Sequence, residues 1–72
     1  MQESISDYYT VIANNFKKLR LANKLSQEKF AEKISCSREF ISRVENYHER
    51  VSLQMILETA RLFNVNPEYF FK

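Results

Sequence analysis

Residues 25–45 read LSQEKFAEKISCSREFISRVE, and this stretch decides the fold. Ser26 and Ser37 each stand directly before a run with helical spacing, and a serine hydroxyl there caps the free N–H groups of a helix. The stretch therefore predicts two short helices, over residues 27–34 and 38–46, joined by a tight turn. Their inward faces consist of Phe30, Ala31, Ile34, Ile41 and Val44.

Helical spacing also extends to both sides of this pair, with no useful length of strand-like alternation. A longer helix is predicted over residues 7–22, with an inner face of Tyr8, Ile12, Phe16 and Leu19. Ser52 caps a fourth helix that ends near Phe63, and Pro67 begins a short last helix that ends near Phe71. The fourth helix is predicted to turn inward Leu53, Ile56, Leu57, Ala60 and Phe63. The prediction is a compact all-α domain of five helices.

Composition excludes several classes of function. A chain of 72 residues has room for one domain. It has no glycine, so it has no glycine-rich phosphate loop, and one cysteine and one histidine are too few for a disulfide or a structural zinc site. No catalytic triad or paired-carboxylate cleft is available, so we expect no enzyme, no cofactor, no metal and no small-molecule ligand. The acidic N-terminus and apolar runs of at most three residues predict a cytoplasmic protein without a membrane segment.

Positive charge gathers around the two short helices. Residues 17–50 hold nine basic and five acidic residues, whereas the whole chain carries a net charge of only +2. Such a segment is either a solvated helical surface or a face that attracts an anionic partner. Two short helices joined by a tight turn are also the geometry of a helix-turn-helix.

The sequence resembles the Cro/repressor-type (XRE) helix-turn-helix family. The resemblance is carried by the start Leu25-Ser26-Gln27, the pair Ile41-Ser42 and the following Glu45. It covers about residues 11–71, which we take as the DNA-binding domain, and leaves residues 1–10 as an N-terminal extension or the start of the first helix. The family usually has glycine at four positions that here are Lys24, Ser35, Tyr47 and Asn64, and often proline at Val51. These departures affect the expected turn geometry, and only Asn64 readily takes a positive φ.

The resemblance implies that the helix over residues 38–46 enters the major groove of double-stranded DNA. Its outward residues Arg38, Glu39, Ser42 and Arg43 are then the candidate base contacts. Arginine can bind guanine bidentately and glutamate can accept from cytosine. The alternative is that both arginines are solvated charge and that Glu39 holds an arginine in place or favours the helix N-terminus.

Other positions are implied to contact the DNA backbone. The candidate phosphate contacts are Gln27, Asn46, Tyr47, His48, Lys17 and Arg50. For Lys17 the alternative is ordinary solvation. In the family the positions of Arg20 and Glu45 form a structural ion pair between the first helix and the recognition helix. Phe40 either touches DNA or packs partly against the core, and Cys36 is expected to be a half-buried residue in the turn.

Further apolar residues predict a partner surface. Met55 and Leu62 share a face of the fourth helix outside its predicted core stripe, and Tyr69 and Phe71 are expected to extend it. Family members usually form homodimers on palindromic operators, so we expect a homodimer with an interface at Met55, Leu62, Tyr69 and Phe71. Scattered surface apolar residues are the alternative.

The expected function is that of a sequence-specific transcription regulator, a repressor or autoregulator of bacterial or phage origin. The stretch around Phe40, the segment Val51-Ser52-Leu53 and the pair Phe70-Phe71 resemble restriction–modification controller proteins. A phage-type repressor, an antitoxin and the N-terminal domain of a longer regulator stay open. The rival class is a protein-interaction module, antitoxin-like or adaptor, that uses the same fold without an operator.

Overall fold

Four α-helices and one 3-10 helix make up the computed structural model, which describes residues 4–72, the side chain of Ser6 excepted. They are α1 (Ile5–Ala22), α2 (Gln27–Lys33), α3 (Arg38–Glu45), α4 (Leu53–Leu62) and η1 (Pro67–Phe71). The predicted all-α fold is confirmed, but the fifth element is a 3-10 helix because a five-residue segment that starts with proline is too short for a regular α-helix. None of the helices within the described residues is long and apolar enough to span a membrane.

Each α-helix begins at a serine cap. The hydroxyls of Ser4, Ser26, Ser37 and Ser52 each accept a hydrogen bond from the backbone N–H three residues later. At Ser4 the cap is reciprocal, because Asp7 also accepts from the Ser4 backbone N–H at 3.1 Å. This capping box makes α1 begin at Ile5 rather than at the predicted Asp7, so residues 5–10 belong to the first helix.

The turns use residues other than glycine in the left-handed conformation. Among residues 4–72, four have φ between 56° and 66°, namely Lys24, Ser35, Tyr47 and Asn64. They are the four positions where the family usually has glycine. Each follows a helix end and lets the next backbone N–H return to the helix, as in the hydrogen bond of 2.9 Å from Cys36 to Ala31. The turn geometry is therefore kept, at a cost of about 1 kcal/mol for each residue that is not Asn or Gly.

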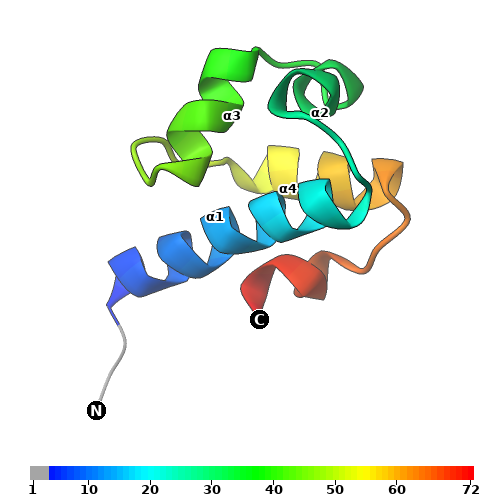
Figure 1. The fold of residues 1–72 in the computed structure, drawn as a ribbon. Helices are drawn as coiled ribbons and strands as arrows, with labels where there is room; N and C mark the ends of the chain where they lie inside the picture. Colours follow the sequence, from blue (N-terminus) through cyan, green and yellow to red (C-terminus); the bar gives the residue numbers. More distant parts are fainter. Residues whose placement is uncertain (1–3) are drawn as a thin grey trace.

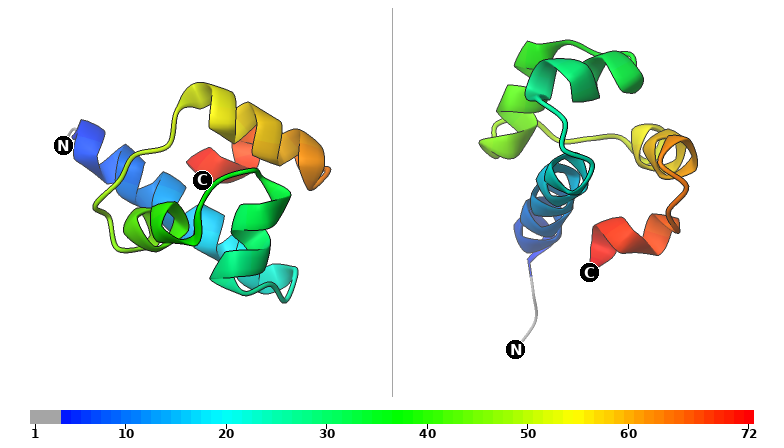
Figure 2. Two further views of the ribbon diagram at one scale, coloured as in Figure 1. Left: turned by 90° about the horizontal axis from the view of Figure 1, so that it is seen from above. Right: turned by 45° about the vertical axis from the view of Figure 1, so that its right-hand side comes forward.

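The helices α2 and α3 lie together at one end of the molecule, and η1 lies at the other (Figures 1 and 2). The long helix α1 runs between them and contacts both α3 and η1. A hydrogen bond of 3.0 Å from the buried Asn15 side chain to the Phe70 carbonyl fixes η1 to α1. The helix-turn-helix pair is thus presented at one end by a scaffold made from the rest of the chain.

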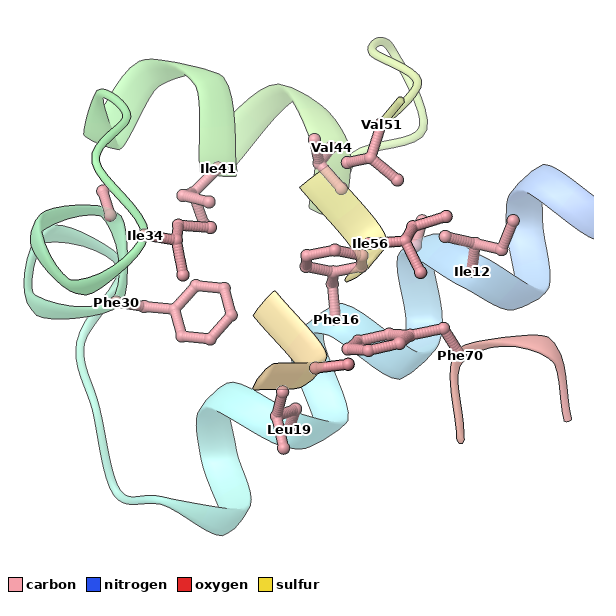
Figure 3. Close-up of a cluster of buried hydrophobic side chains, with 13 residues drawn as sticks. Ile12, Phe16, Leu19, Phe30, Ile34, Ile41, Val44, Val51, Ile56 and Phe70 are labelled. Atoms are coloured by element: carbon pink, nitrogen blue, oxygen red, sulfur yellow. The ribbon is translucent and has the colours of Figure 1, made fainter. Parts of the chain in front are cut away.

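Aromatic rings fill the centre of the core (Figure 3). Phe16 from α1 packs against Phe70 from η1, with ring centroids 4.7 Å apart, and meets the edge of Phe30 from α2 at 6.3 Å. Phe30 also stacks on Phe63 at 5.3 Å. The aliphatic side chains around these rings are Ile12, Leu19, Ile34, Ile41, Val44, Val51 and Ile56. One continuous core therefore joins all five elements.

Three of the predicted inward residues are instead exposed. Tyr8 lies near the start of α1, where the neighbouring Tyr9 is the residue that packs against the core. In α4 the buried stripe runs through Ile56, Thr59 and Ala60, so the helix is rotated relative to the prediction. As a result Leu53 and Leu57 face solvent, at 64% and 47% exposure. The prediction was wrong here because five apolar residues form a wide face on α4, and the sequence alone does not show which side of this face packs against the core.

Thr59 is expected to tolerate, and even favour, an apolar replacement. It is fully buried, and within the described residues its hydroxyl has no hydrogen-bond partner. Thr59→Val keeps the shape and removes the unsatisfied hydroxyl, whose burial costs about 1–3 kcal/mol. Urea denaturation should show a higher free energy of unfolding for the variant. A loss of stability would mean that the hydroxyl has a partner in solution.

Candidate nucleic-acid interface

The turn between α2 and α3 sets the angle at which α3 is presented. Ser35 takes a φ of 60°, and the Ser37 hydroxyl accepts from the Phe40 N–H at 3.0 Å, so α3 starts immediately after the turn. Ile41 and Val44 are buried and fix α3 to the core. The opposite face of α3 is therefore turned to solvent.

That outward face carries the predicted base-contact residues. Arg38, Glu39 and Arg43 are all exposed, and Ser42 is half-buried. Asn46, placed in the helix by the sequence, instead ends α3 as its C-cap, and its amide donates to the Ser42 carbonyl at 2.9 Å. The face thus presents two guanidinium groups and one carboxylate, all of which can form hydrogen bonds to base edges.

Both arginines of this face have carboxylate neighbours. Arg38 Nη2 lies 3.7 Å from Glu39 Oε2, which agrees with the alternative reading of Glu39 as a partner of an arginine. Arg43 Nε lies 3.2 Å from Oε1 of Glu49, in the loop after α3. Sequence reasoning did not find the second pair, because six residues separate its members across a helix end.

Behind this face lies a hydrogen-bonded network around Glu45. Arg20 Nε lies 2.7 Å and Nη2 3.0 Å from the Glu45 carboxylate, and the two side chains are only 11% and 6% exposed. Arg20 Nη1 also donates to the Leu25 carbonyl at 2.8 Å. The predicted ion pair between α1 and α3 is thus present as a bidentate, nearly buried contact that fixes the recognition helix to the scaffold.

Gln27 takes part in the same network. Its amide nitrogen donates to Glu45 at 3.0 Å, so the side chain of this candidate phosphate contact is half-buried and turned toward the ion pair. One amide N–H is then occupied. The amide group carries a second hydrogen that can donate to another acceptor.

The loop after α3 is held against α1 rather than free. The Tyr47 hydroxyl donates to Asn14 Oδ1 at 2.5 Å, and the Arg50 guanidinium lies 4.3 Å from the centre of the Tyr9 ring. Tyr47 and Arg50, both expected at phosphates, therefore have partners on α1. Two further candidate phosphate contacts, Lys17 and His48, are exposed.

Phe40 and Cys36 have mainly structural roles. Phe40 is half-buried and packs against the core, which was one of the two roles predicted for it. Cys36 is half-buried in the turn, and burial raises the pKa of its thiol above the ordinary value. The reactive thiolate is therefore disfavoured. Within the described residues no group of three or more His, Cys, Asp or Glu side chains is placed to hold a metal ion.

Residues of the predicted dimer interface line two different grooves. Met55 and Leu62 line a groove between α4 and the end of α2, whereas Phe71 lines another groove with Ile5 and Leu53. Tyr69 is half-buried, with its ring beside Phe70 and the Lys18 ammonium group. The two flanks of α4 therefore carry separate apolar surfaces.

These features define the class of protein. A helix-turn-helix with an exposed polar recognition face and a buried ion pair behind it is the arrangement of a DNA-binding domain. The helix-turn-helix family model HTH_3 matches residues 16–70. The chain therefore belongs to the HTH_3 family and is a DNA-binding transcription regulator of the XRE type.

Solved structures agree with this assignment. The restriction–modification controller protein C.AhdI from Aeromonas hydrophila is 30% identical, with a TM-score of 0.77 over 88% of this chain and 96% of that one. A point mutant of the restriction–modification controller protein C.Esp1396I is 26% identical, with a TM-score of 0.77 over 97% and 86%. The hypothetical transcription factor NHTF from Neisseria, at 22% identity and a TM-score of 0.81 over 100% and 84%, shows the same fold. No curated protein sequence matches the chain.

Proposed function

We propose that this protein regulates transcription as a homodimer that reads a palindromic DNA operator with helix α3. The observation that carries the proposal is the outward face of α3, where Arg38, Glu39 and Arg43 stand exposed while Ile41 and Val44 anchor the helix. A helix presented in this way fits the major groove, and its side chains reach the base edges.

The residues of this face have distinct roles. Arg38 and Arg43 donate to guanine O6 and N7. The shorter side chains of Ser42 and Glu39 also contact base edges, and Glu39 accepts from cytosine N4. The flanking DNA backbone is contacted by six residues, Lys17, Gln27, Asn46, Tyr47, His48 and Arg50. Tyr47 contacts Asn14 and Arg50 contacts the Tyr9 ring in the structure. Each of the two either breaks this contact to reach a phosphate or contacts the phosphate while it keeps its partner.

We place the dimer contact on the flank of α4 that carries Leu53 and Leu57. Both leucines are exposed, and Ile5, Tyr8 and Phe71 continue the same apolar surface across α1 and η1. Four of these exposed apolar side chains line one groove, and Leu57 lies one helical turn from Leu53 on the same flank, so together they form a patch of the kind that marks an interface. The groove of Met55 and Leu62 is the competing location, and Met55 already packs against the core.

A controller role is the most specific form of the proposal. The likeness to C.AhdI extends over 88% of this chain and 96% of that one at 30% identity, which supports a regulator of this kind. Such a regulator acting on its own gene would find its operator in the promoter of that gene. Footprinting of the protein on this promoter tests the autoregulatory role, and absence of protection there assigns the operator to another gene.

Arg43→Ala is expected to relax base discrimination at one base pair of each half-site. The wild-type operator should be bound more weakly by about 1–3 kcal/mol, because a bidentate guanine contact is lost. Fluorescence anisotropy on the selected operator and on single-base variants measures both effects. Equal weakening on operator and random DNA would show that Arg43 contacts only phosphate.

Salt dependence separates this function from a protein-interaction module. Each phosphate neutralised by Lys or Arg releases counterions, so operator affinity should fall steeply between low and moderate salt. The affinity of an apolar protein interface should barely respond to the same change. A flat salt response of the tightest binding partner would favour the interaction module.

A further inference from the structure

The contact between Arg43 and Glu49 has a geometry that bears on base reading. Glu49 accepts from Nε, the inner nitrogen of the guanidinium group, at 3.2 Å. Within residues 4–72 neither terminal nitrogen of Arg43 forms a hydrogen bond. The edge formed by Nη1 and Nη2 is thus left unoccupied, and it is this edge that can donate two hydrogen bonds to O6 and N7 of one guanine.

The backbone that carries Glu49 is positioned by contacts that do not involve the Arg43 side chain. Tyr47 turns the chain with a φ of 66°, and the His48 N–H donates to the Arg43 carbonyl at 2.8 Å. On either side of Glu49 the loop is fixed to α1, by the Tyr47 hydroxyl on Asn14 and by Arg50 over the Tyr9 ring. Glu49 is therefore held at the end of α3 by the fold itself.

A carboxylate at this place has two opposing effects on DNA binding. It restricts the rotamers of Arg43, so less conformational entropy is lost when the arginine binds a base. It also brings a negative charge close to the DNA backbone, which weakens binding to any sequence. The first effect favours the correct base over other bases, whereas the second weakens binding to all sequences and leaves that preference unchanged.

We propose that Glu49 is a positioning residue that orients the Arg43 guanidinium for guanine and so sets the base preference of α3. The inference rests on the proposed DNA-reading function. It assigns specificity to a loop residue outside the recognition helix. The opposite role, in which Glu49 competes with DNA for Arg43, is an outcome that the experiment below would reveal.

The test compares two substitutions at Glu49 with a charge-matched control. Glu49→Ala removes the acceptor, and Glu49→Gln keeps an acceptor oxygen but removes the charge. Glu32→Gln removes one exposed negative charge from α2, where Glu32 pairs with Lys29. The operator is first selected with the wild-type protein, and circular dichroism confirms that all variants fold.

The readout is the ratio of dissociation constants for the operator and for its variant without the guanine assigned to Arg43. A bidentate contact predicts a ratio of about tenfold or more for the wild type. Glu49→Ala should lose most of this ratio, Glu49→Gln should keep part of it, and Glu32→Gln should leave it unchanged. The double variant with Arg43→Ala and Glu49→Ala should have the same ratio as Arg43→Ala alone, because the two residues act through one contact.

Two results would overturn the inference. An unchanged ratio in Glu49→Ala would show that Glu49 does not orient Arg43. Tighter operator binding with an undiminished ratio would show that Glu49 competes with DNA. If the wild-type protein selects no sequence at all, the proposed DNA-reading function fails, which is a separate outcome from either result at Glu49.

Discussion

Glu45→Ala should lower the free energy of unfolding by about 3 kcal/mol, within the range of ~3–5 kcal/mol for breaking a buried ion pair from one side. The substitution leaves the Arg20 guanidinium nearly buried, with the Leu25 carbonyl as its remaining partner among residues 4–72, and it also removes the acceptor of Gln27. A loss of this size is a large part of the stability of a small domain. Urea denaturation followed by circular dichroism measures it.

Two further variants make the result specific to the ion pair. Glu45→Gln keeps an acceptor for Arg20 and should be less destabilising than Glu45→Ala. Glu32→Ala removes an exposed carboxylate of the same type and should change stability by no more than about 0.5 kcal/mol. If Glu45→Ala were no more destabilising than Glu32→Ala, the network would not hold α3 to α1.

Leu57→Lys should dissociate the dimer and leave the monomer folded. Leu57 is 47% exposed, so replacing it with lysine should lower the stability of the monomer only slightly. In a two-fold symmetric dimer, however, the substitution appears on both subunits at the same interface. Because the monomer already buries about half of Leu57, losing the remaining burial on both subunits is worth roughly 1.5–3 kcal/mol, or at least about tenfold in the dimer dissociation constant. Added repulsion between the lysines acts in the same direction. Sedimentation velocity and circular dichroism report assembly and folding separately.

Leu62→Lys is the matched control, because Leu62 lies on the other flank of the same helix at 58% exposure. It should leave the dimer and its operator affinity unchanged. Dissociation by Leu62→Lys and not by Leu57→Lys would move the interface to the groove of Met55 and Leu62. A wild-type protein that sediments as a monomer both alone and on the operator would exclude the homodimer.

The parts of the fold that local chemistry determines were predictable. Ser26, Ser37 and Ser52 mark helix starts through a bond to a nearby N–H, so the sequence locates α2, α3 and α4 within a residue. The resemblance located the left-handed turns, because a residue such as Ser35 is not itself a signal for positive φ. The ion pair of Arg20 was likewise found through the family.

Tertiary contacts decide the features that sequence reasoning missed. The apolar residues of α4 extend around more than one face, and only packing against the other elements determines that Thr59 is buried and Leu53 exposed. The same holds for Glu49, whose position depends on the contacts of Tyr47 and Arg50 with α1. No periodicity within α3 shows that a carboxylate in the next loop reaches Arg43.

The most direct test of the account is selection of bound sequences from a random pool of double-stranded DNA at moderate salt. The account predicts enrichment of a two-fold symmetric sequence whose half-site centres lie about 10 base pairs apart, one turn of the double helix. With Arg43→Ala the selected sequence should keep its symmetry and lose preference at one position in each half-site. A pool that stays random after repeated selection with the folded wild-type protein would contradict the claim that α3 reads DNA.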